Sequence, residues 1–138
     1  MATSRTPREA REAIYQSFFT YWSGTPQSEV SLVWDNIDFK MQGTEFIHVS
    51  SAHVSGTIGA LGNEKYRRTM ILTINIWTPE GSGQKRSDEL AEVILAWVET
   101  FNVAGFRIRD PGFNEIGVFS GYYQSSVIAT LEYDALRT

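Results

Sequence analysis

The clearest pattern of apolar and polar positions lies between residues 66 and 101, where apolar side chains first occupy every second position. Such alternation predicts a β-strand with one buried face. That face consists of Met70, Leu72, Ile74 and Ile76, and the strand is expected to end at Thr78-Pro79. After a glycine-containing turn at 81–83, the spacing becomes that of an amphipathic helix. Its apolar stripe consists of Leu90, Ile94, Trp97, Val98 and Phe101.

Another helix is predicted near the N-terminus, after residues 1–5, which are expected to be flexible. The run Thr6-Pro7-Arg8-Glu9 has the form of a capping box, with Thr6 as the N-cap. The helix is expected to end at about Trp22, before Gly24 and Pro26. Its core stripe is expected to consist of Ala10, Ile14, Phe18 and Tyr21. A second, aromatic stripe is rotated from the first by about 100° and consists of Tyr15, Phe19 and Trp22.

The remaining strands complete the predicted fold. They are expected at 31–34, 46–55, 106–109, 115–119 and 122–133. Residues 56–63 are expected to form a flexible connection, so that the strands on either side make a long hairpin. A turn is expected at Asp110-Pro111-Gly112. The order of elements predicts one α+β domain over residues 1–138, with a mostly antiparallel sheet and two helices packed on one face.

Composition excludes several classes of protein. The chain has 138 residues, which suits one domain, and no cysteine, which excludes disulfides and thiolate metal sites. Its formal net charge of −4 and its lack of a basic stripe argue against a dedicated DNA-binding protein. A mildly acidic surface instead suits one past which nucleic acid moves without sticking. No apolar run approaches the ~20 residues of a membrane span, and no secretory leader is expected.

Candidate catalytic motifs are weak. His48 and His53 are separated by an odd number of strand positions, which predicts that they lie on opposite faces and share no metal. Residues 117–121 lack the spacing of a nucleophile elbow. The glycines of 56–62 precede a strand and lack the Gly-Lys-Ser/Thr triplet of a phosphate loop. We therefore expect no catalytic residue, no metal and no cofactor.

Three acidic residues have two possible interpretations. Asp35, Asp38 and Glu45 surround a predicted loop. Paired carboxylates hydrolyse glycosides when a cleft holds them, but the sequence indicates no cleft. We expect them to be solvated loop residues.

In order, length and total size, the predicted elements resemble the tail terminator proteins of long-tailed bacteriophages, the lambda-type and related tail-completion families. The resemblance rests on the helix at 9–22, Val33-Trp34-Asp35-Asn36, Phe46-Ile47-His48-Val49, Tyr66-Arg67-Arg68, the strand ending at Thr78-Pro79, Gly81-Ser82-Gly83 and the strand at 127–133. It implies a structural virion protein, assembled in the host cytoplasm and located in the tail or neck. Such proteins form a hexameric ring that caps the tail tube, stops its polymerisation and joins it to the head–tail connector or stopper protein. DNA would pass through the ring without specific binding.

Two other classes remain open: another neck ring or a tail tube subunit, and a small enzyme or ligand-binding domain. Two interaction sites are hypothesised from the residues themselves. Tyr15, Phe19 and Trp22 are either covered by loops of the same chain or form a subunit or ring interface, where aromatic residues are enriched. The segment 56–65 is expected to be mobile in the isolated protein and to dock on the tube or connector; the alternative is a solvent-exposed turn with no partner. Its contacts would come from Ile58, Leu61, Lys65, Arg67 and Arg68.

Overall fold

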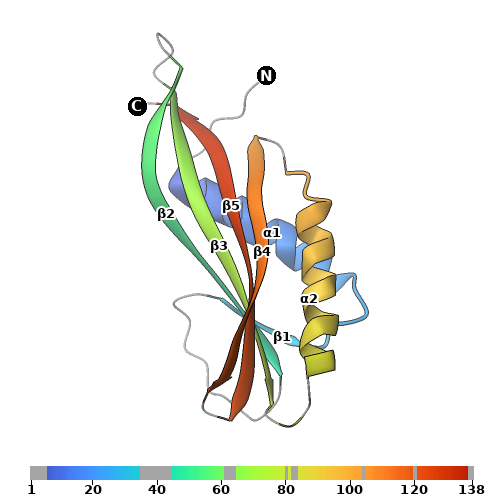
Figure 1. Cartoon of the computed structure of the whole chain (residues 1–138). Coiled ribbons are helices and arrows are strands. Elements are labelled where there is room, and N and C mark those ends of the chain that lie inside the picture. The colour runs from blue at the N-terminus through green and yellow to red at the C-terminus, as the bar shows by residue number, and fades with distance from the viewer. Residues whose placement is uncertain are drawn as a thin grey trace.

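The computed structural model describes residues 6–34, 45–60, 65–79, 81, 84–103, 105–119 and 121–136. The elements along the chain are α1 (Pro7–Ser23), β1 (Ser31–Trp34), β2 (Phe46–Ala60), β3 (Lys65–Pro79), α2 (Gln84–Glu99), β4 (Phe106–Phe119) and β5 (Tyr122–Leu136) (Figure 1). The protein is therefore α+β, as the sequence predicts.

The described strands form a twisted sheet in the order β1-β2-β3-β5-β4 (Figure 1). β1 is parallel to β2, and every other neighbouring pair is antiparallel. The predicted hairpin between β2 and β3 is confirmed. β3 occupies the centre and pairs with β5 without a register shift, from Lys65 opposite Leu136 to Pro79 opposite Tyr122.

β2 is longer than predicted, and residues 56–60 belong to the strand. The expectation of a flexible connection beginning at residue 56 is therefore wrong for these residues. The register with β3 shifts between Val54 and Thr57 and again between Ile58 and Ala60. Each shift inserts one extra residue into β2, which is the definition of a β-bulge. Glycines weaken an ordinary strand but often mark bulges, so their presence misdirected the prediction.

β4 is a single strand, so the prediction of two short strands around a turn is wrong. The register with β5 shifts between Arg109 and Gly112, which places Asp110-Pro111 in a bulge rather than a turn. β4 lies at the edge of the described sheet, where a proline is tolerated because one side of the strand has no partner. A second shift, between Glu115 and Gly117, leaves Ile116 as an extra residue.

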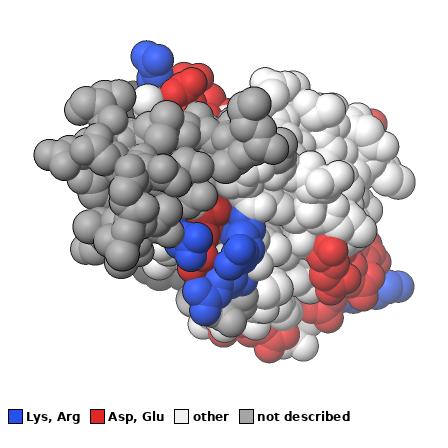
Figure 2. Space-filling model, turned by 90° about the horizontal axis from the view of Figure 1, so that it is seen from above, with Lys and Arg blue, Asp and Glu red and all other residues white. Residues whose placement is uncertain are grey.

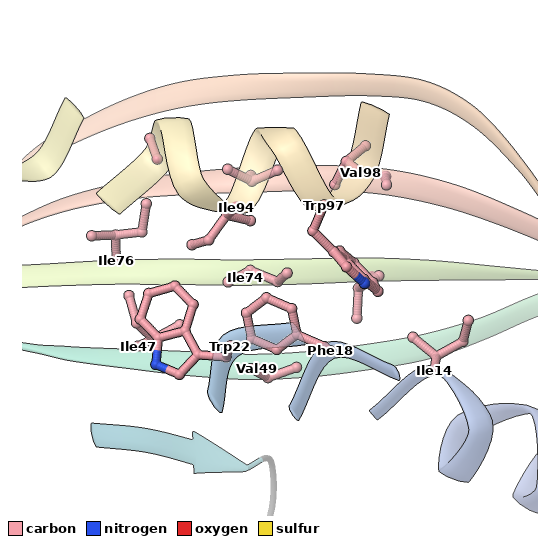
Figure 3. Close-up of a cluster of buried hydrophobic side chains, with 14 of the residues drawn as sticks. Ile14, Phe18, Trp22, Ile47, Val49, Ile74, Ile76, Ile94, Trp97 and Val98 are labelled. Carbon is pink, nitrogen blue, oxygen red and sulfur yellow. The ribbon is translucent and has the colours of Figure 1, made fainter. Parts of the chain in front are cut away.

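The main hydrophobic core joins both helices to the sheet (Figure 3). The predicted inner face of β3 is buried, with exposed fractions of 2% or less. Phe18 of α1 meets Trp97 of α2 edge to face, with ring centroids 5.1 Å apart. The hydroxyl of Tyr21 donates to the carbonyl oxygen of Val93 at 2.7 Å, which also ties α1 to α2. The two helices are therefore fixed to each other as well as to the strands.

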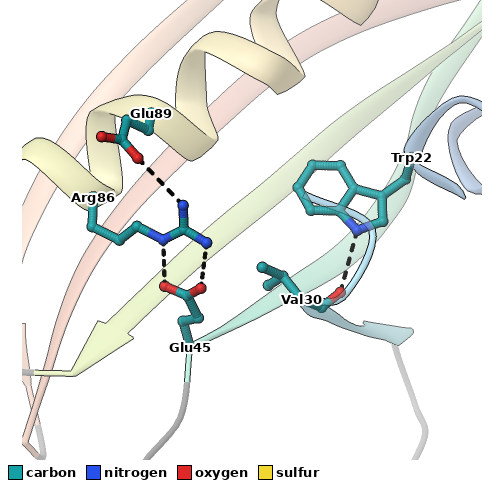
Figure 4. Close-up of polar contacts among 5 residues, drawn as sticks. All are labelled: Trp22, Val30, Glu45, Arg86 and Glu89. Carbon is teal, nitrogen blue, oxygen red and sulfur yellow. Dashed lines mark hydrogen bonds and ion pairs between the residues drawn. The ribbon is translucent and has the colours of Figure 1, made fainter. Parts of the chain in front are cut away.

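α1 begins as predicted and buries a slightly different stripe. Thr6 Oγ1 accepts from the Glu9 amide at 3.2 Å, and the Glu9 carboxylate accepts from the Thr6 amide at 3.1 Å, which confirms the capping box. At the other end, Trp22 is 2% exposed and takes the core position expected for Tyr21. The indole Nε1 of Trp22 donates to the Val30 carbonyl at 3.2 Å (Figure 4). Trp22 is therefore a core residue and not part of an exposed aromatic stripe.

The burial of these side chains generates a stability prediction. Trp22→Ala should lower the free energy of unfolding by about 3–5 kcal/mol, because it leaves a large cavity beside Phe18. Phe19→Ala is the matched control, since Phe19 is 49% exposed. It should cost no more than about 1 kcal/mol. Urea unfolding followed by circular dichroism measures both. Similar costs for the two variants would contradict the assignment of Trp22 to the core.

Candidate functional site

An aromatic groove lies between α1 and β1. The rings of Tyr15 and Trp34 are 4.9 Å apart between centroids, and Phe19 beside them is the most exposed aromatic of the helix. The groove encloses an open hollow of about 780 Å³. It is lined by Glu9, Glu12, Ala13, Tyr15, Gln16, Phe19 and Trp34, and we refer to it as the α1–β1 groove. Large apolar side chains are thus presented at the surface within an acidic border.

The groove corrects the aromatic set hypothesised from the sequence. Tyr15 and Phe19 lie in it, but Trp22 does not, because it is buried. Trp34 takes the third place, and the sequence analysis missed it. Helical spacing relates residues within α1 only, whereas Trp34 reaches Tyr15 because β1 pairs in parallel with β2. An aromatic residue at the end of a short strand was the available signal.

The opposite edge of the described sheet is formed by β4 and differs in character. Ile116 and Val118 are 57% and 60% exposed, the largest exposures among the big apolar side chains of the described residues. Arg107 and Arg109 lie exposed nearer the start of the strand, and Arg109 forms an ion pair with Glu132 at 2.6 Å. Figure 2 looks down on this end of the molecule and shows basic and acidic side chains together near the centre of the view.

The residues of the hypothesised docking loop do not form one surface. Ile58 lies in β2 opposite Tyr66, and Lys65 opens β3 opposite Ala60. Leu61 lies outside the described residues. Arg67 and Arg68 are successive strand residues and so point to opposite faces.

The two arginines consequently belong to different neighbourhoods. Arg67 lines a hollow of about 200 Å³ together with Arg107 and Glu132. Arg68 stands directly opposite Tyr133, which is 2% exposed, and so lies on the core side of the sheet. Arg68 is therefore not part of an exposed loop tip, contrary to the hypothesis from the sequence.

A polar cluster closes the core beneath the first turns of α1. The Arg11 guanidinium donates from Nε to Ser51 Oγ at 2.9 Å and contacts His53 Nδ1 through Nη2 at 3.3 Å. His53 Nε2 lies 2.7 Å from the Tyr133 hydroxyl. Since arginine only donates, Nδ1 must accept, and Nε2 then carries the hydrogen that His53 donates to Tyr133. We call Arg11, Ser51, His53, Arg68 and Tyr133 the His53 cluster.

The environment of this cluster favours neutral side chains at its centre. Burial lowers the pKa of His53, and the positive charges of Arg11 and Arg68 lower it further. Burial raises the pKa of Tyr133. The sequence analysis missed this cluster because its members come from four elements, α1, β2, β3 and β5. It correctly separated His53 from His48, which instead lies 3.5 Å from the Asn75 amide.

Glu45 has a structural role rather than that of a solvated acid. Its carboxylate accepts two hydrogen bonds from Arg86 of α2, one from Nε at 2.7 Å and one from Nη2 (Figure 4). Arg86 also pairs with Glu89 at 3.3 Å. The hydrogen bond to Glu45 raises the pKa of Arg86. Because both partners are about one-quarter exposed, this bidentate pair fastens the start of β2 to α2. Asp35 and Asp38 lie outside the described residues.

Within the described residues, no group of three or more His, Cys, Asp or Glu side chains could hold a metal ion. The same part of the chain contains no helix with the length and apolar character needed to cross a membrane.

Comparison with known proteins identifies the fold alone. No known protein family and no curated protein sequence matches this chain. A solved structure, whose designation states no function, superposes with a TM-score of 0.67 at 14% sequence identity. The match covers 94% of this chain and 96% of the other. An identity this low supports a shared α+β architecture and nothing about activity.

The lowered pKa of His53 generates a prediction about pH. Its folded value lies below the unfolded value of 6.5, so the unfolded chain binds the proton first as the solution is acidified. The contribution of neutral His53 to the free energy of unfolding is fully present above pH 6.5 and is lost as the pH falls through the folded pKa. His53→Gln should therefore flatten the decline in unfolding free energy below pH 6.5. Urea unfolding of the wild type and of His53→Gln across this range measures the decline, and equal slopes for the two proteins would contradict the prediction.

Proposed function

We propose that this chain is a structural, non-enzymatic ring protein of a phage tail. In this role it caps the tail tube, stops tube polymerisation and joins the tube to the head connector. The observation that carries the proposal is the α1–β1 groove, in which Tyr15, Phe19 and Trp34 are presented at one edge of the sheet. Aromatic residues at a surface of this kind are typical of protein interfaces. The resemblance in element order to tail terminators supplies the biological role.

We infer further that both helices cover the same face of the sheet. Tyr15 of α1 contacts Ser51, which follows Val49 by two positions and so shares its face. Val49 belongs to the same core cluster as Ile94 of α2. The other face then carries polar side chains at its centre and, at one end, an aromatic cluster of Phe46, Trp77 and Tyr122. The centre of this face is a hydrogen-bonded group in which Asn75 accepts from Ser126 at 2.6 Å.

The ring would form head to tail, with the β4 edge of one copy in the α1–β1 groove of the next. A closed ring of identical subunits needs two different, complementary patches. The exposed Ile116 and Val118 supply apolar side chains for the aromatic groove. The positive charge of Arg107 and the negative charge of Glu12 complement each other across the same contact.

The register of the sheet supports this alignment of charges. Arg107 of β4 pairs with Glu132 of β5, which pairs with Thr69 of β3, which pairs with Val54 of β2. Arg107 and Val54 therefore lie at the same height across the sheet. The first turns of α1 lie at that level, because Arg11 contacts His53. Two copies placed side by side at equal height would therefore bring Arg107 of one towards Glu12 of the next.

The tip of the β2–β3 hairpin is the proposed contact with the tail tube or connector. Ile58 and Lys65 lie in the paired strands that lead to the tip, and Arg67 follows on the face away from Arg68. In Figure 1 this end of the hairpin extends beyond α1 and α2. The net charge of −4 suits a ring through which DNA passes without specific binding.

Assembly in solution tests the proposed ring interface. Phe19→Ala should weaken assembly by about 2 kcal/mol, or roughly thirtyfold, because an aromatic anchor leaves its pocket. Glu12→Arg and Arg107→Glu should each weaken it by about fivefold or more, and the double reversal should restore it. Light scattering with negative-stain images measures the outcome.

Glu92→Arg is the matched control, since Glu92 is exposed on α2 away from the groove. It should assemble like the wild type. A double reversal no better than the single variants would contradict this pairing of edges. Filaments in place of rings would favour a tube subunit. A monomer at all concentrations would reject self-assembly.

The proposed role in the virion is tested by deleting the gene. Heads and tube protein should still form, but joined particles should be absent and tubes of abnormal length should accumulate. Electron microscopy of the lysate measures tube length, and wild-type protein supplied from a plasmid should restore joined particles. Tails of normal length attached to heads in the deletion strain would rule out the terminator role.

A further inference from the structure

The His53 cluster contains more hydrogen-bond donors than acceptors. Arg68 Nε is buried and has no hydrogen-bond partner, the one such buried side-chain nitrogen or oxygen among the described residues. A buried donor without an acceptor costs free energy and needs an explanation. Its position opposite Tyr133 fixes the backbone from which it projects, so the donor is held inside the end of the core.

The Tyr133 hydroxyl adds a second donor to the same place. His53 Nε2 donates to the Tyr133 oxygen, because Nδ1 already accepts from Arg11. The hydroxyl hydrogen of Tyr133 therefore points elsewhere, and no side chain of the cluster accepts it. Ser51 Oγ is occupied by Arg11 and by the Tyr15 hydroxyl, which lies at 2.9 Å.

The charges of the cluster are also unbalanced. The ion pairs among described side chains join Arg8, Arg86 and Arg109 to glutamates, and none of them includes Arg11 or Arg68. Both guanidiniums nevertheless act electrostatically on His53. Two like charges beside a half-buried histidine are unfavourable unless an anion compensates them.

We propose that the His53 cluster is a binding site for an oxyanion, either a phosphate or a carboxylate group. Its oxygens would accept from Arg68 Nε, from the Tyr133 hydroxyl and from the remaining N–H groups of Arg11. Arginine recognises both anions through short, charge-assisted hydrogen bonds. At the two ends of the cluster, Arg11 is exposed and Tyr133 is buried. The site adjoins the α1–β1 groove through the contact between Tyr15 and Ser51, but it does not depend on the proposed ring.

Thermal unfolding of the full chain at constant ionic strength tests the proposal. Sodium chloride is compared with sodium phosphate and with sodium acetate at pH 7. Phosphate, acetate or both should raise the melting temperature of the wild type above its value in chloride. Arg68→Gln should weaken that binding at least about tenfold, while leaving the melting temperature in chloride unchanged or higher. Arg8→Gln, an equal change of charge at an exposed position of α1, should keep the wild-type response.

A second measurement separates binding at the cluster from a general salt effect. An anion beside His53 favours the charged imidazole and should raise its pKa, which an NMR titration of the two histidines follows directly. A response to phosphate alone identifies a phosphate site, and a response to acetate alone a carboxylate site. The proposal would be overturned if neither phosphate nor acetate raised the melting temperature above its value in chloride. It would also be overturned if Arg68→Gln responded to the anions as the wild type does. Should Arg68→Gln fail to fold, Arg11→Gln replaces it with the same criteria.

Discussion

The uninterrupted pairing of β3 with β5 is the constraint on which the rest of the structure depends. A slip of one residue would turn every inward side chain of a strand outward, so a continuous register fixes both faces at once. Met70 and Leu131 consequently stand opposite each other inside the core. Both neighbouring strands, β2 and β4, contain register shifts. Register shifts are thus confined to the pairings of β2 and β4, and the helices pack on a sheet whose central pair, β3 and β5, is regular.

The same register determines which side chains lie where the core ends, near the start of β3 and the end of β5. Two positions beyond Met70 the inward residue of β3 is Arg68, and two positions beyond Leu131 that of β5 is Tyr133. The inward row therefore changes from apolar to polar without leaving its face. α1 supplies Arg11 at this level, which keeps the polar end half-covered instead of fully solvated. The same alternation of side chains along β3 and β5 therefore places apolar residues in the core and hydrogen-bond donors at the edge of the core.

The sequence pattern predicted correctly those features that depend on interactions between residues close in sequence. The alternation of β3, the stripe of α2 and the cap at Thr6 depend on residues close in sequence. The alternation and the cap are confirmed, and so is the stripe except for Phe101, which follows the end of α2 at Glu99 and is only partly buried. The choice between Tyr21 and Trp22 was not decidable, because both follow Phe18 at helical spacing and only the neighbouring Val30 carbonyl favours the indole. The place of Trp34 in the groove and the His53 cluster were missed, because strand pairing brings these residues together from distant parts of the chain.

Pro111 shows how an irregular residue limits what an edge can do. It lies in the first bulge of β4, and it offers no N–H to a neighbouring strand. The outer edge of β4 is thereby divided into two short stretches, and no extended segment can pair along all of it. Fibrils grow by adding strand after strand to a long, flat edge. This chain therefore discourages endless backbone pairing and leaves recognition at that edge to side chains, which specify a partner.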